Sequence, residues 1–254
     1  MTKFVVMGIQ RTGTILLCSS LNQHPEILSL DEIFVNHPFY KPGIIPSFRN
    51  YVVEVGKSDV PKLINHKRTI YKYLNQFYSL PDYTSRGFKL MANQANHLTY
   101  IKKYLRKHKV KIIKMTRANV FKVYLSRYRA EQTGLFHSRQ KRIAKDIPRL
   151  AKILITLPVD RLLTELEEIE RENRQLDHIV DSLQTPNITV KYESLVKDFP
   201  TSLSDVLSFL EVTPDIPIKP ARKKISPSLL SESIENCEDV RSALSGTKYE
   251  HYLE

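Results

Sequence analysis

The chain has 254 residues, of which 41 % are apolar and 26 % charged, and its formal net charge is +12. The composition predicts a soluble globular protein with a sizeable core, and the length allows one large α/β domain or two small ones. The positive charge indicates acidic partners: a nucleotide, an anionic substrate, a nucleic acid or an anionic membrane surface. The two cysteines, Cys18 and Cys237, lie far apart in sequence and form neither a disulfide framework nor a metal-ligand pattern.

No apolar run approaches the length of a membrane span, and the first residues indicate a strand rather than a signal peptide. We therefore expect a cytoplasmic protein without a metal site. Homo-oligomer formation and transient contact with a membrane surface stay open from the sequence.

Residues 4–21 predict a strand, a tight turn and a helix in direct succession. Phe4–Met7 is an apolar run, Gly8–Gly13 forms the turn, and the leucines at 16, 17 and 21 have the spacing of a helix face. Such an arrangement gathers backbone N–H groups at a helix N-terminus, which favours an anion. The simpler interpretation is a plain strand-turn-helix that contains two glycines.

The two glycines have the spacing of a Walker A loop, but the residues after them differ. Thr14 stands at the lysine position, and Ile15 stands where a magnesium-binding hydroxyl is expected. Arg11 is the replacement cation, and Thr12 and Thr14 offer hydroxyl groups. We therefore predict a loop for a phosphate or phosphosulfate group that is handled without a metal.

The next predicted strand, Ile27–Leu30, places Asp31 and Glu32 at its carboxyl end. Strand ends next to a phosphate loop hold ligands in open α/β sheets, so Glu32 is the candidate general base. The alternative is a solvated acidic pair. Residues 35–62 are rich in proline and predict a long irregular loop that could shape an acceptor pocket.

Predicted helices and strands alternate along the chain after this loop. We predict helices over 62–80, 97–107 and 120–131, and strands over 87–91 and 109–115. Arg117 follows the second of these strands and Ser126 lies nearly two turns into the next helix, so both could reach one phosphate. The basic run 102–114 could instead be a solvated face, and it matches known nucleic-acid modules poorly. Residues 147–183 predict a long helix whose alternating charges indicate a solvated face or a dimer surface.

Several of these segments resemble sulfotransferases that use 3′-phosphoadenosine 5′-phosphosulfate. Gly8–Pro25 resembles their 5′-phosphosulfate loop, and Thr116–Asn119 followed by Ser126 resembles their 3′-phosphate element. Asp31–Phe34 is similar to the segment with the candidate base, and Asn187–Asp198 with the helix after it is similar to a late strand and helix. The likeness is greatest to bacterial carbohydrate and glycolipid sulfotransferases, the group that includes trehalose sulfotransferase.

The resemblance implies one sulfotransferase-like α/β domain over residues 1–254, with a helical insertion at about 140–184. It implies a P-loop-like three-layer fold with a central, mainly parallel sheet flanked by helices. The implied reaction moves a sulfuryl group from 3′-phosphoadenosine 5′-phosphosulfate to an acceptor hydroxyl, on a carbohydrate or glycolipid, and leaves adenosine 3′,5′-bisphosphate. No nucleic-acid partner and no metal are implied.

The resemblance also implies roles for particular residues. Arg11 and Glu32 would be catalytic. The residues that would hold the cofactor are Arg11, Thr12, Gly13, Thr14, Arg117, Ser126, Lys223 and Lys224.

Three positions depart from the family pattern: Arg11 replaces a common lysine, Ile15 replaces a hydroxyl residue, and Ala118 interrupts an Arg-Asn pair. Two other functions stay open. One is a P-loop kinase or nucleotidase with a degenerate Walker A loop, and the other is a non-enzymatic module that binds nucleic acid or another anion.

Overall fold

The computed structural model describes residues 1–35, 45–54, 67–97, 99–134, 153–214, 216–221 and 230–253. The chain divides into two compact units. Unit 1 comprises Met1–Thr116 and Gln175–Ala221, and unit 2 comprises Arg117–Arg174 and Arg222–Glu254. The single domain with a helical insertion at about 140–184 stays a prediction.

Unit 1 is built on a five-stranded parallel sheet with the strand order β2-β3-β1-β4-β5. The strands are β1 (Thr2–Gly8), β2 (Ile27–Leu30), β3 (Ser85–Met91), β4 (Lys111–Thr116) and β5 (Asn187–Lys191). Because all five run in one direction, their carboxyl ends meet at one edge: Gly8 is in register with Met91 on one side and Met115 on the other. The predicted α/β fold with a central, mainly parallel sheet is confirmed.

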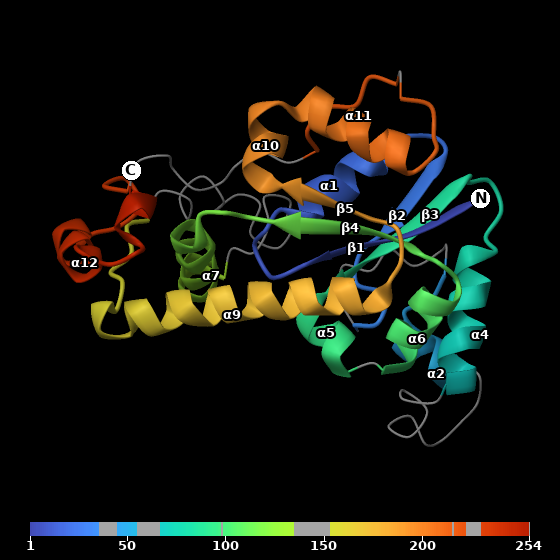
Figure 1. Ribbon diagram of the computed structural model, residues 1–254, viewed down its shortest axis with the longest axis horizontal. Helices are drawn as coiled ribbons and strands as arrows, with labels where there is room; N and C mark the ends of the chain where they lie inside the picture. The colour runs from blue at the N-terminus through green and yellow to red at the C-terminus, as the bar shows by residue number, and fades with distance from the viewer. Residues whose placement is uncertain are drawn as a thin grey trace. The chain divides into compact units, whose positions relative to one another are not determined.

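Helices cover both faces of this sheet (Figure 1). One face carries α1 (Thr14–Leu21), α10 (Tyr192–Lys197) and α11 (Phe199–Phe209); the other carries α2 (Phe48–Glu54), α4 (Lys67–Tyr78), α5 (Ala92–His97) and α6 (Thr99–Lys107). The central strand β1 is therefore buried on both sides, which explains why its residues from Phe4 to Met7 are consecutively apolar and fully buried. On the α1 face, Phe4 and Val6 pack with Leu17, Leu21 and Val206.

Two sequence-based expectations about regular structure were wrong. The proline-rich region 35–62 contains a helix, α2, which forms because Phe48, Tyr51 and Val52 are buried against the rest of unit 1; residues 36–44 and 55–66 lie outside the described ones. The helix predicted over 147–183 begins only at Val159, directly after Pro158. Before it, Ile155 pairs with Ile234 in an isolated parallel bridge, so the chain there is extended.

Unit 2 contains α7 (Val120–Thr133), the first part of α9 (Val159–Leu183), α12 (Cys237–Leu244) and the 3₁₀ turn η2 (Glu250–Leu253). A buried guanidinium links its segments: Arg129 on α7 donates to the carbonyl oxygens of Ile153 at 2.6 Å and Ser233 at 2.7 Å. Arg127, also on α7, donates to both carboxylate oxygens of Glu172 on α9. These charge-assisted bonds tie α7 to α9 and to the C-terminal segment.

Among the helices of the described ranges, none combines the length and the apolar character needed to cross a membrane.

Candidate active site

The turn between β1 and α1 has the backbone shape of an anion-binding loop. Arg11 has φ 70° and Gly13 has φ 91°, both in the left-handed region. A non-glycine residue in this region is uncommon and occurs preferentially at functional sites. No side chain of the described residues caps the N-terminus of α1, and its first intrahelical bond runs from the Leu17 N–H to the Gly13 carbonyl at 3.1 Å. The N–H groups of the first turn therefore have no intrahelical partner and can bind an anion.

Steric contacts explain why both ends of the turn are glycine. A Cβ atom at Gly8 would lie 2.8 Å from Oγ1 of Thr12 and 2.8 Å from Cγ2 of Thr14. A Cβ atom at Gly13 would lie 2.6 Å from Cδ2 of Tyr192, the first residue of α10. The chain at the end of β5 thus closes directly onto the loop, and only glycine allows this approach.

The two threonines of the loop are both buried. The hydroxyl of Thr12 donates to the Ile9 carbonyl oxygen at 2.9 Å and so stabilises the turn itself. The hydroxyl proton of Thr12 is thus engaged inside the loop, and the group that Thr12 can offer to a ligand is its backbone N–H. The cationic side chain of the turn is Arg11, which is partly exposed.

Glu32, the candidate base, is held by two side chains that the sequence did not point to. Its Oε1 lies 2.7 Å from Nζ of Lys89 on β3, and its Oε2 accepts a hydrogen bond of 2.5 Å from Nε2 of Gln94 on α5. Lys89 also pairs with Oδ1 of Asp31 at 3.3 Å. Both oxygens of the Glu32 carboxylate are therefore oriented, and its side chain remains 20 % exposed, enough for a substrate to reach it.

Lys89 is a buried lysine in the interior of the sheet, with a side chain only 6 % exposed. Burial alone would lower the pKa of its ammonium group, but the charges of Asp31 and Glu32 more than offset this effect and raise the pKa above its ordinary value of 10.5. Lys89 is therefore a fixed positive charge at neutral pH. The signal that could have found it is a lysine inside the apolar strand segment Gly87–Met91, where a buried charge needs a partner.

Cys18 lies one turn into α1 and is buried. Burial raises the pKa of its thiol to about 12. It is a packing residue at neutral pH.

The residues predicted to hold a 3′-phosphate belong to unit 2 or lie outside the described residues. Arg117 directly follows β4, and Ser126 lies in the second turn of α7. Asn119 caps α7 through a bond of 2.8 Å from the Lys122 N–H, and its amide donates to the Tyr252 carbonyl at 2.9 Å. Arg117 and Ser126 belong to unit 2 and the loop belongs to unit 1, so a ligand shared by all three stays a prediction. Lys223 and Lys224 lie outside the described residues.

Within unit 1, the loop and the Glu32 group lie at the same edge of the sheet. The loop follows β1, Glu32 follows β2, and the strand between them, β3, supplies Lys89 and leads into Gln94. An anion cradle and an oriented carboxylate at one edge can bind an anionic donor and accept a proton from a second substrate. The part of the chain that the structure describes contains no group of three or more His, Cys, Asp or Glu side chains that could hold a metal ion.

Comparisons with known proteins bear on the family and the fold of the chain. A family model described as the sulfotransferase family matches residues 4–215, and no curated protein sequence matches the chain. A sulfotransferase structure from Alicyclobacillus acidocaldarius is similar with a TM-score of 0.51 and 17 % identity over 100 % of this chain and 96 % of that chain. The sulfotransferase domain from the curacin biosynthetic pathway has a TM-score of 0.46 and 14 % identity over 100 % of this chain and 89 % of that chain. A sulfotransferase structure from Mycobacterium avium has a TM-score of 0.47 and 12 % identity over 96 % of this chain and 75 % of that chain. The first of these structures has the same fold.

Proposed function

Because the chain belongs to the sulfotransferase family, we propose that it transfers a sulfuryl group from 3′-phosphoadenosine 5′-phosphosulfate to an acceptor hydroxyl on a carbohydrate or glycolipid. The observation that carries the proposal is the pairing of an anion loop with an oriented carboxylate at one edge of the sheet in unit 1. Each alone is common, whereas sulfuryl transfer to a hydroxyl requires both.

The chemistry of the loop fits the anionic 5′ end of this donor. Arg11 contributes a fixed charge, and the uncapped first turn of α1 contributes backbone N–H groups. Gly13 lets the Tyr192 ring pack directly against the loop, since the position has no Cβ atom. Ile15 has no hydroxyl for a magnesium ion, so the Walker A way of holding a triphosphate does not fit this loop.

When bound, the donor supplies an electrophilic sulfur and a phosphate leaving group. Arg11 and the backbone N–H groups of Thr12, Gly13 and Thr14 would stabilise the negative charge that develops on the oxygen bridging sulfur and phosphorus. Glu32 would accept the proton of the acceptor hydroxyl while the new sulfur–oxygen bond forms and the bridging bond breaks. The products are a sulfate ester and adenosine 3′,5′-bisphosphate, and the proton remains on Glu32 until solvent removes it.

Lys89 and Gln94 would act through Glu32. They bind its two oxygens from different elements, which restricts rotation of the carboxylate. A base that is already oriented loses less entropy on reaching the transition state. We therefore assign Lys89 and Gln94 as positioning residues.

The 3′-phosphate would be held by Arg117, Ser126, Lys223 and Lys224. Support for the two lysines comes from the chain that leads to them in unit 1. The Thr213 carbonyl binds His24 at 2.8 Å, the Lys219 carbonyl binds Gln23 at 2.7 Å, and the Ala221 N–H binds Ser20 at 3.2 Å. This segment thus packs against the C-terminal end of α1 and the turn after it.

Calorimetric titration with adenosine 3′,5′-bisphosphate and with 5′-AMP, with divalent metal chelated, tests the proposal. Wild type should bind the bisphosphate more tightly than 5′-AMP, by about tenfold to a hundredfold, because a charged pair to the 3′-phosphate contributes about 1.5–3 kcal/mol. Arg117→Ala should remove this difference, and Arg11→Ala should weaken both ligands alike. Equal affinity of wild type for the two nucleotides would contradict the proposal.

A second measurement separates the alternatives. Release of adenosine 3′,5′-bisphosphate from the donor should increase when trehalose or a glycolipid is added, and Glu32→Gln should abolish the increase. Magnesium-dependent ATP turnover would favour the kinase or nucleotidase alternative.

A further inference from the structure

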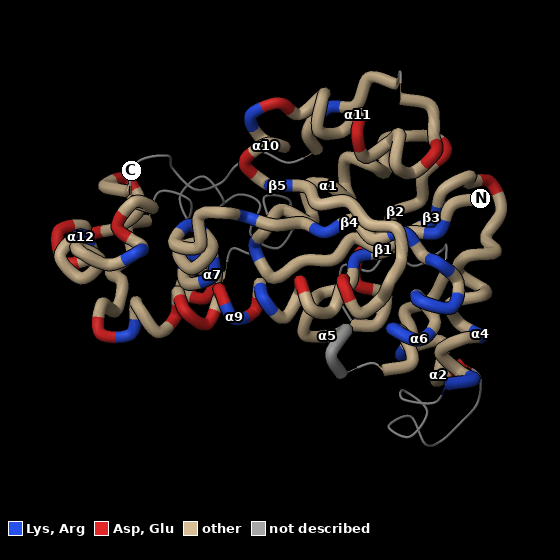
Figure 2. The backbone as a smooth tube through the Cα atoms, in the orientation of Figure 1, with Lys and Arg blue, Asp and Glu red and all other residues tan. Residues whose placement is uncertain are grey.

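The solvent side of α4 and α6 forms a basic face, which we define as Lys67, Arg68 and Lys72 on α4 with Lys102, Lys103, Arg106 and Lys107 on α6. Neither helix contains an aspartate or glutamate. Figure 2 accordingly shows blue segments and no red ones along both helices. The face therefore carries seven cations that no acidic residue of its own helices compensates.

The cations of the basic face also have no ion pair with any other described residue. The ion pairs of unit 1 engage other lysines: Lys89 with Glu32, Lys111 with Glu211, and Lys114 with Asp177. Burial together with the nearby charges of Lys3 and Lys107 lowers the pKa of His108, at the end of α6. This shift fits a local excess of positive charge, and an anionic partner would reduce the repulsion.

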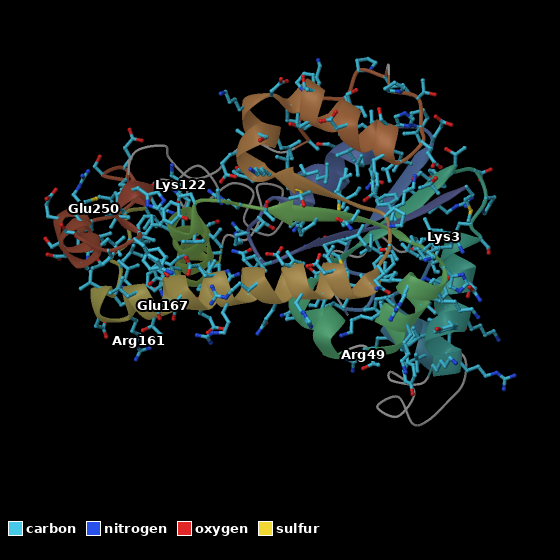
Figure 3. All side chains as sticks on the ribbon, in the orientation of Figure 1. Lys3, Arg49, Lys122, Arg161, Glu167 and Glu250 are labelled. Carbon is cyan, nitrogen blue, oxygen red and sulfur yellow. The ribbon has the colours of Figure 1, made fainter. Side chains whose placement is uncertain are left out.

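A rigid aromatic seam holds the two helices together beneath these charges. The Tyr71 ring on α4 meets the Tyr104 ring on α6 edge-on at 5.1 Å between centroids, and Tyr104 donates to Asn75 at 2.9 Å. Lys3, labelled in Figure 3, reaches over the rings of Tyr78 and Tyr104 at 5.3 and 5.9 Å. The seven cations therefore lie on two helices that pack against each other rather than on a loop.

Two features of the basic face decide which kind of partner fits. The large apolar side chains that are exposed in the described parts of the chain are Met1, Val53, Ile153, Leu154, Leu163 and Val196, and none lies on α4 or α6. A protein partner is normally anchored by such side chains, so the face has no anchor of that kind. The faces of Tyr71 and Tyr100 are covered by Lys67 and Lys103, at 5.6 and 5.5 Å, and so offer little ring surface for stacking nucleic-acid bases.

The interaction that fits the basic face is therefore electrostatic attraction between its cations and an extended anionic surface. Five of the seven cations are lysines, which act as hydrated point charges rather than as bidentate phosphate ligands. An open hollow of about 630 Å³, lined by Lys67, Arg68, Tyr71, Lys72 and Asn75, lies on the α4 side of the face. Clusters of four to eight basic residues are typical of proteins that bind anionic lipid headgroups.

We propose that the basic face docks unit 1 on an anionic phospholipid surface. The contact is peripheral, because the face has cations and tyrosines but no apolar side chains that could insert into the lipid. The proposal is independent of the reaction assigned above. It would bring the candidate active site near the lipid, because Phe34, two residues after Glu32, lies 5.8 Å from the Tyr73 ring on the inner side of α4.

Vesicle co-sedimentation tests the proposal with the full chain. Wild type should bind phosphatidylcholine vesicles that contain about 30 % phosphatidylserine and should not bind pure phosphatidylcholine, and about 1 M salt should abolish binding. Replacing Lys67, Lys72, Lys103 and Lys107 by glutamine should lower the partition coefficient by about fivefold per lysine, hence by at least a hundredfold.

The control variant has the same change in net charge on other elements: Lys197→Gln, Arg161→Gln, Arg174→Gln and Arg241→Gln. It should keep most of the binding. Both variants should keep the cooperative thermal unfolding of wild type, which shows that they are folded. No binding of wild type to the phosphatidylserine vesicles, or an equal loss in the control, would overturn the proposal. It would also be overturned if duplex DNA or polyglutamate bound the same face more tightly than the vesicles.

Discussion

Nζ of Lys89 and Oε1 of Glu32 lie 2.7 Å apart and join the interior of β3 to the residue that follows β2. The lysine is almost fully buried, whereas the glutamate is partly exposed at the edge of the sheet. A buried ammonium group is costly unless it is paired, so the lysine and the carboxylate constrain each other. This relationship makes the orientation of Glu32 a property of the sheet rather than of the loop after β2.

We expect Lys89→Met to lower the rate of sulfuryl transfer by up to about a hundredfold, because Glu32 loses one of its two anchors. The affinity for adenosine 3′,5′-bisphosphate should stay unchanged, since Lys89 contacts Glu32 and Asp31 rather than the loop. Release of the bisphosphate from the donor measures the rate, and calorimetry measures the affinity. Lys89→Arg should restore part of the rate.

Lys114→Met is the matched control for Lys89→Met. Lys114 lies on β4, which β1 separates from β3, and forms an ion pair of 2.8 Å with Asp177, away from Glu32. Both variants should lose about 1–3 kcal/mol of unfolding free energy at most, and only the Lys89 variant should lose activity. Equal losses of activity would show that Lys89 has a general structural role.

Glu32→Gln should reduce the rate by about 10²–10⁴-fold, because the amide cannot accept the acceptor proton. Asp31→Asn is a sharp comparison, since Asp31 also pairs with Lys89 but its side chain is 50 % exposed and makes the longer contact of 3.3 Å. Its effect should be less than about tenfold. If Asp31→Asn were the more damaging change, Asp31 rather than Glu32 would be the base.

The sequence was sufficient for the loop because its signals are local. An apolar run that is buried on both faces, two glycines at fixed spacing and a helix directly afterwards leave few alternative structures for residues 4–21. The same holds for the position of Glu32, which depends only on where β2 ends, whereas its role as the base stays a prediction.

Lys89 and Gln94 could not be found in this way. They contact Glu32 from segments about sixty residues further along the chain, and although a lysine within an apolar strand segment indicates a buried charge, it does not indicate which residue is its partner. The helix α2 was missed for a related reason: the prolines around it suggested a loop, whereas the burial of Phe48, Tyr51 and Val52 stabilises the helix from outside the segment.

Gly13→Ala should weaken the binding of adenosine 3′,5′-bisphosphate by more than about tenfold. The alanine Cβ would lie 2.6 Å from the Tyr192 ring, so the loop or the start of α10 must shift. Gly246→Ala is the matched control, because Gly246 also has a positive φ, of 69°, but no atom of the described residues lies within 4 Å of a Cβ built there. Backbone strain should lower the unfolding free energy of both variants by about 1–2 kcal/mol, the contact with Tyr192 should add to the loss in Gly13→Ala, and only Gly13→Ala should lose nucleotide affinity. Unchanged affinity in Gly13→Ala would contradict a role of the loop in binding.

The pH dependence of stability can be predicted for the ion pair of Glu170 and Lys248 in unit 2, which lie 2.6 Å apart. The hydrogen bond from Lys248 is the largest cause that lowers the pKa of Glu170 below its ordinary value of 4.5. A carboxyl group with a lowered pKa in the folded state stabilises the fold above its unfolded pKa, and this contribution is lost as the pH falls through the folded value. At pH 7, Lys248→Met should therefore lower Tm by no more than about 3 °C, and the difference from wild type should shrink below pH 4.5.

Lys197→Met, at an exposed lysine on α10, should leave the pH profile of Tm unchanged. A difference between Lys248→Met and wild type that stays constant down to about pH 3 would assign the effect of Lys248 to packing on Tyr249, over which its ammonium group lies at 4.9 Å, rather than to Glu170.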